Sequence, residues 1–204
     1  MPGTTSNSRP GALAGPPARP SAASVGSRAA LAVASVLGVL YAALSAYWGS
    51  GGHALLSTIG GTLAREGRAG NPGLLAIVWL TVTLKLVAVG AGLTAVVSHR
   101  WIAAARRRIA RRVAWAAAII LTLYGGVLTI TGLLVQSGAV HASASADHRA
   151  LRWHALVWDP WFLAWGVALA VALAGSRARA VTPMGSRGRG SAPARTRPVT
   201  RPRG

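Results

Sequence analysis

The chain has 204 residues, of which 52% are hydrophobic and only 12% are charged. A soluble domain carries about 25% charged residues and a disordered chain has few apolar ones, so this composition excludes both classes. The formal net charge of +19 is compatible with nucleic acid or with anionic lipid as a partner. There is no cysteine, which excludes structural disulfides, thiolate metal sites and cysteine-based catalysis.

The first apolar segment follows a tail, residues 1–28, that is rich in Pro, Gly, Ser and Arg. We expect this tail to be disordered, because it has too few apolar side chains to offset the entropy of ordering. Residues 29–48 are long and apolar enough for a transmembrane helix, which needs about 20 residues. A signal peptide is the alternative, but the length of the segment and the later spans favour an uncleaved helix.

Small residues recur every four positions on one face of this first span. Helices in lipid associate through close backbone contact at such faces, and the third and fourth apolar segments carry similar ridges. The ridges therefore predict a compact bundle, whereas an outward-facing ridge would support a homo-oligomer or a membrane partner protein. The ridge of the first span consists of Ala30, Ala34, Gly38, Ala42 and Ala46.

The second and third spans are predicted at residues 74–98 and 113–136, and Lys85 is the one charged residue in them. The segment between them, residues 99–112, combines six arginines with a few large apolar side chains. We expect it to be a cytoplasmic helical extension that lies against anionic lipid headgroups. The basic residues expected to make these contacts are Arg106, Arg107, Arg108, Arg111 and Arg112.

A fourth span is predicted at residues 153–174, although Asp159 and Pro160 interrupt it. Either the helix starts at Pro160 with Asp159 as its N-cap, or it starts near Trp153 and kinks at the proline. Residues 176–204 form a second tail, which we also expect to be disordered. Its Gly-Arg repeats lack interleaved aromatic residues that would stack on bases, so we expect lipid contact and no specific nucleic acid.

The distribution of arginine predicts the orientation in the membrane. The two tails and the loop at residues 99–112 hold most of the arginines, while the other two loops hold Arg65, Arg68, Arg149 and Arg152. By the positive-inside rule both ends are cytoplasmic. The expected fold is an all-α four-helix bundle, residues 29–175, in a cell membrane. The bias toward Ala and Arg, with a single lysine, is typical of a GC-rich bacterial genome.

Lys85 lies near the middle of the second span, where an uncompensated ammonium costs about 2.5 to 3.5 kcal/mol. Its depth is roughly 16 Å from the outer edge by helical rise, and Asp159 enters the bilayer from the same side. We therefore predict an intramembrane ion pair between Lys85 and Asp159, with a proton or ion relay as its possible function. In the alternative, Lys85 reaches a carbonyl, a water, or the neighbouring Thr81 and Thr83, and serves assembly alone.

Histidines and carboxylates gather near the predicted outer side, which raises the alternative of a metal or haem site. Their spacing matches neither an H-E-x-x-H helix nor a zinc knuckle, and histidines in loops are usually solvated. We therefore predict no metal, no cofactor and no catalytic residue. The residues concerned are His53, His141, His148, His154, Glu66 and Asp147.

Two aromatic segments carry the most specific sequence pattern, and interfacial anchoring accounts for aromatic residues at both. One is Tyr47-Trp48-Gly49-Ser50-Gly51-Gly52, and the other is Trp158-Asp159-Pro160-Trp161-Phe162-Leu163-Ala164-Trp165-Gly166. Over about residues 30–175 the chain resembles the small bacterial four-helix membrane proteins called domain of unknown function 3995. The resemblance implies an outer-face arrangement in which the turn around Tyr47, Trp48, Gly51 and Gly52 meets the turn formed by Trp158, Asp159, Pro160 and Trp161. It implies no activity.

The leading functional hypothesis is a non-catalytic structural or interaction subunit of the bacterial cell membrane. One alternative is a small transporter or a proton or ion pathway that uses Lys85 and Asp159. Another is a membrane protein that uses the outer histidines to bind a cofactor.

Overall fold

The computed structural model describes residues 22–97, 103–143 and 146–181, and these ranges contain helices and no strand. The long helices are α1 (Ala22–Gly49), α3 (Pro72–Val96), α4 (Ala104–Gln136) and α6 (Asp159–Val181). The short elements are the 3-10 helix η1 (Leu56–Thr58), α2 (Gly61–Arg68), α5 (His148–Trp153) and the π-helix η2 (His154–Trp158). The predicted all-α class is confirmed.

Four helical segments are long and apolar enough to cross a membrane, as predicted. They are Val25–Gly49, Pro72–Val96, Ala104–Gln136 and His148–Arg177. The predicted tails, residues 1–28 and 176–204, fall mostly outside the described residues. Helix α1 begins at Ala22 and α6 ends at Val181, so the helices extend a few residues into the sequence of both tails.

The fourth span begins upstream of the position at which its proline suggested a start. Asp147 is the N-cap of α5, because its side chain accepts a hydrogen bond from the Ala150 N–H (3.1 Å). The helix then continues through the π-helix η2, where the Asp159 N–H donates to the carbonyl of His154, five residues earlier. A π-turn relieves the clash that a helical proline causes with the carbonyl four residues before it. Asp159 is therefore not an N-cap, and the span starts before Trp153.

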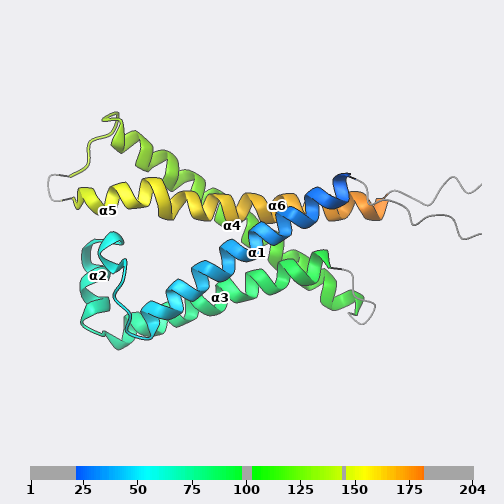
Figure 1. The fold of residues 1–204 in the computed structure, drawn as a ribbon, viewed down its shortest axis with the longest axis horizontal. Coiled ribbons are helices and arrows are strands. Elements are labelled where there is room, and N and C mark those ends of the chain that lie inside the picture. The colour runs from blue at the N-terminus through cyan, green and yellow to red at the C-terminus, as the bar shows by residue number, and fades with distance from the viewer. Residues whose placement is uncertain (1–21, 98–102, 144–145, 182–204) are drawn as a thin grey trace, which may run out of the picture.

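The four long helices form a bundle that opens toward one end (Figure 1). Helix α6 packs against both α1 and α4, and α3 packs against both α1 and α4. The start of α1 and the end of α6 lie at the same end of the bundle, whereas α2 lies at the opposite end (Figure 1). Toward that opposite end, α1 and α3 diverge from α5 and α6 (Figure 1). We call residues 50–71, which include η1 and α2, the cap.

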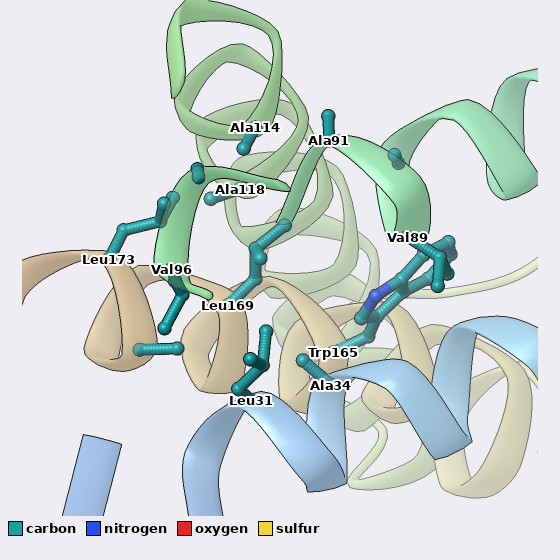
Figure 2. Packing of buried hydrophobic residues seen from close by; sticks show 13 residues of the cluster. Leu31, Ala34, Val89, Ala91, Val96, Ala114, Ala118, Trp165, Leu169 and Leu173 are labelled. Atoms are coloured by element: carbon teal, nitrogen blue, oxygen red, sulfur yellow. The ribbon is translucent and has the colours of Figure 1, made fainter. Parts of the chain in front are cut away.

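The buried apolar core lies in the half of the bundle nearer the start of α1 and the end of α6. Side chains from all four long helices point toward one another there (Figure 2). They are Leu31 and Ala34 of α1, Val89 and Val96 of α3, Ala114 and Ala118 of α4, and Trp165, Leu169 and Leu173 of α6. Trp165 is 1% exposed, and it packs beside Gly38, where an added Cβ would lie 2.6 Å from its ring. The small-residue ridge of α1 is therefore used inside the bundle, since Ala34, Gly38 and Ala42 are all buried.

The outward faces of the long helices are strongly apolar. Helix α4 shows this best, because Ile120, Leu123 and Val127 are each more than 60% exposed. A soluble protein rarely exposes a continuous apolar face of this kind, whereas a bilayer requires one.

Candidate functional site

A cavity of about 150 Å³ lies between α1 and α3 on the side of the bundle that carries the cap. Tyr41, Ser45 and Trp48 of α1 line one wall. The facing wall comes from α3, with Leu74, Leu75 and Val78 nearer the start of the helix and with Thr81 and Lys85 deeper. Leu56, Ile59 and Gly67 of the cap complete the lining. The cavity is thus apolar near the cap and polar at its deep end.

Lys85 is held at the deep end by three neutral groups. Its Nζ donates to Ser45 Oγ (2.7 Å) and, over a longer distance, to Thr81 Oγ1 (3.5 Å). It also lies 4.4 Å from the centroid of the Tyr41 ring, which is cation–π geometry. These contacts solvate the ammonium but do not neutralise its charge.

The predicted ion pair between Lys85 and Asp159 is not present in this structure. Asp159 instead contacts His154, with 3.3 Å between Nδ1 and Oδ1. The alternative expectation for Lys85 describes its contact with Thr81 correctly, whereas Thr83 is exposed and bonds the carbonyl of Trp79. Ser45 and Tyr41 are the partners that sequence reasoning missed. The sequence contains a signal for these contacts, which is the four-residue spacing. Tyr41 and Ser45 are one helical turn apart on α1, as Thr81 and Lys85 are on α3.

The two hydroxyl groups that accept from the ammonium both donate to backbone carbonyls. Ser45 Oγ donates to the carbonyl of Tyr41 (3.0 Å), and Thr81 Oγ1 donates to the carbonyl of Val78 (2.8 Å). Trp48 Nε1, at the opposite end of the cavity, donates to the carbonyl of Ala54 (2.8 Å). The ammonium is therefore the group at this site that can supply a hydrogen bond and a positive charge together.

Aromatic residues of the fourth span contact both α1 and the cap. The rings of Trp48 and Trp158 pack edge to face with centroids 5.9 Å apart. Trp158 is 3% exposed, and its Nε1 donates to Thr58 Oγ1 (3.2 Å) in η1. Trp161 Nε1 donates to the carbonyl of Leu37 in α1 (3.1 Å). Through these contacts α6 supports both α1 and the cap beside the cavity.

His154 forms a second link between the fourth span and the cap. Its Nδ1 lies 3.3 Å from Asp159 Oδ1, and its Nε2 lies 3.3 Å from the carbonyl oxygen of Ile59. Both oxygens are acceptors, and an imidazole N–H can donate to the carbonyl of Ile59. Ile59 also lines the cavity, so this contact of His154 holds part of the cavity lining in place.

The sequence places the chain among known proteins. A family profile described as "Protein of unknown function (DUF3995)" matches residues 38–169. The chain belongs to the DUF3995 family. No curated protein and no solved structure matches it.

The two aromatic segments that suggested DUF3995 lie side by side in the structure. Besides the contact between Trp48 and Trp158, the first segment is closed by the Tyr47 hydroxyl, which accepts a hydrogen bond from the Ala54 N–H (3.3 Å). Gly51 has a φ of 89°, which a residue with a side chain rarely adopts, and a Cβ at Gly52 would overlap the Tyr47 ring. The glycines of this DUF3995 segment therefore have a local backbone role. Pro160, in the second segment, follows the π-turn.

The remaining histidines do not gather into a site. Within the described residues, no group of three histidine or carboxylate side chains is placed to hold a metal ion. His53, His141 and His148 are exposed, Asp147 caps α5, and Glu66 accepts a hydrogen bond from the Asn71 side chain (2.8 Å). Of the outer histidines, His154 is the one with a defined structural role.

One of the five basic residues predicted to face lipid turns inward. Arg111 donates to the carbonyl of Leu173 (2.7 Å) and to Ser176 Oγ (2.9 Å), and so joins α4 to α6. Arg106, Arg107, Arg108 and Arg112 are exposed at the start of α4. Trp101 and Ile102 of the predicted helical extension lie outside the described residues.

Proposed function

We propose that this chain is a non-catalytic integral membrane protein that binds a small molecule in the cavity between α1, α3 and the cap. The observation that carries the proposal is a lysine with no carboxylate partner, held at the deep end of a cavity in an otherwise apolar helix pair. Intramembrane ionisable residues are costly and usually mark a functional site. The proposal narrows the leading hypothesis, a non-catalytic structural or interaction subunit, to the binding of a small molecule.

Packing favours a binding protein over a transporter. Beyond Lys85, toward the end of α3, the helix presents Ala88, Val89, Ala91 and Ala95 to the buried core around Trp165. Among the described residues, Asp159 is the titratable side chain in the buried class, and it contacts His154 and does not continue a proton or ion path from Lys85 into this core. The cavity is thus accessible from one side in our proposal, and the pathway through Lys85 and Asp159 becomes the alternative.

The same proposal includes the placement in the membrane. The start of α1 and the end of α6 lie at one end of the bundle, as an even number of crossings requires (Figure 1). The exposed arginines at the start of α4 support a cytoplasmic location for that end, with anionic headgroups as their partners. The cap then lies on the outer side of a bacterial cell membrane. Cysteines introduced at Ser50 and at Ser186 test this orientation, because an impermeant thiol reagent added to intact cells should label the first and not the second.

Accessibility of the cavity is testable because the chain has no native cysteine. Thr81→Cys places a thiol beside Lys85, and a small impermeant methanethiosulfonate reagent should modify it from the cap side only. Thr83→Cys, on the exposed face of the same helix, is the matched control and should stay unmodified in lipid. Modification of Thr81→Cys from both sides would favour the transport pathway instead. An unreactive Thr81→Cys would refute the binding proposal.

A further inference from the structure

We infer that the ligand of this cavity is a small monoanion with a short apolar body, of the class of short-chain carboxylates, and that Lys85 binds its charged group. The inference rests on the proposed function. It follows from three properties of the cavity, which are its charge, its hydrogen-bonding capacity and its size.

The positive charge in the cavity favours an anionic ligand. Lys85 is surrounded by two hydroxyl groups and an aromatic ring, all of them neutral. Among the described residues, Asp159 is the buried carboxylate, and it contacts His154 and not Lys85. A half-buried ammonium without a counter-charge is stabilised when an anion joins it.

The hydrogen-bonding capacity favours a carboxylate over a phosphate. An ammonium has three N–H donors, and one of these is engaged by Ser45 at 2.7 Å. The bond to Thr81, at 3.5 Å, is long enough to be exchanged for a better acceptor. Because Ser45 and Thr81 donate to backbone carbonyls, the ammonium and the Tyr41 hydroxyl are the remaining donor groups of the residues that line the deep end. Phosphate recognition generally uses several donors, such as an arginine fork or a series of backbone N–H groups, and the helical backbone of α1 and α3 presents none here.

The size and the apolar walls restrict the rest of the ligand. A cavity of about 150 Å³ is large enough for a molecule of roughly benzene size. Its upper walls are Leu56, Leu74 and Val78, so the part of the ligand that points away from Lys85 is apolar. A carboxylate with a chain of a few carbon atoms has this size and this polarity. A long fatty acid exceeds the volume.

Binding of n-butyrate to the purified full-length protein in lipid nanodiscs tests the inference, with n-butanol and inorganic phosphate as comparison ligands. Calorimetry should show saturable butyrate binding and at least tenfold weaker binding of the other two. Lys85→Met should weaken butyrate binding at least tenfold, and so should Val78→Phe, which fills the cavity and leaves the charge in place. Thr83→Val, outside the cavity on the same helix, should change it less than twofold.

Several outcomes would overturn the inference, and they separate it from the proposed function. Absence of butyrate binding, equal binding by Lys85→Met, or preferential binding of phosphate each contradicts the ligand class. If Thr81→Cys is nevertheless modified from the cap side, the binding cavity stands and only the ligand class fails. If Lys85→Met does not fold, the Thr81→Cys protein still decides the matter, because an anionic methanethiosulfonate reagent should react several-fold faster than a cationic one. Equal rates would contradict the anion site.

Discussion

Two adjacent glycines of α4 offer a controlled test of how closely the helices pack beside Asp159. At Gly125 an added Cβ would overlap the backbone nitrogen of Leu163 and lie 2.9 Å from the carbonyl oxygen of Asp159. At Gly126 the nearest atom would be the Leu163 Cδ1, at an ordinary 3.7 Å. Both residues lie within the same helix, so Gly→Ala changes the helix propensity equally and only the steric effect differs.

The expected magnitudes follow from these contacts. Alanine gains about 1 kcal/mol over glycine within a helix. At Gly125 the steric overlap costs about 3 kcal/mol, at the upper end for overpacking, because the opposing atoms are backbone and cannot rotate away. We therefore expect Gly125→Ala to lower the free energy of unfolding by about 2 kcal/mol and Gly126→Ala to raise it by up to about 1 kcal/mol.

The measurement is a denaturant titration of both variants and the wild type in the same detergent, followed by circular dichroism. Gly125→Ala should also move the backbone of Asp159 away from α4 and so disturb its contact with His154. Equal stabilities of the two alanine variants would refute the proposed packing of α4 against α6. A less stable Gly126→Ala protein would refute the assignment of the interface to Gly125.

Two further predictions concern single contacts between distant segments. Arg111→Ala removes both hydrogen bonds to α6 and should lower the unfolding free energy by about 1–3 kcal/mol, whereas Arg112→Ala, which is exposed, should change it by less than about 0.5 kcal/mol. Denaturant titration measures both variants, and an equal loss of unfolding free energy in the two would contradict the inward role of Arg111. His154→Phe removes the link to Ile59 and should increase hydrogen exchange at residues 55–60, while the exposed His148→Phe should not; unchanged exchange in His154→Phe would show that the cap is held without this link.

The family of this chain and its aromatic signature could be recognised from sequence because they depend on local residue order. The turn at Gly51 and Gly52 is an example, since a positive φ and a ring packed against the backbone both involve residues within a few positions of one another. The segment around Pro160 was harder to interpret. Its proline signals an interruption of a regular helix, but a π-turn and a helix start are both compatible with that signal.

The pairing of Lys85 shows where sequence reasoning stops. Depth in the bilayer correctly suggested that Lys85 needs compensation, and Asp159 was the available carboxylate at a suitable depth. Depth does not specify the rotation of each helix about its axis, however. In the structure this rotation turns Lys85 toward Ser45, forty positions earlier, and turns Asp159 toward His154.

The sequence by itself therefore determined that the chain is helical and contains four segments able to cross a membrane. The reason is that each segment must by itself be long enough to cross the bilayer and must satisfy its own backbone hydrogen bonds as a helix. Only the tertiary structure decided that Lys85 lies in a cavity without a carboxylate, that Arg111 faces inward, and that His154 holds the cap at Ile59. These contacts depend on helix rotation and crossing, which arise from the packing of all four helices together.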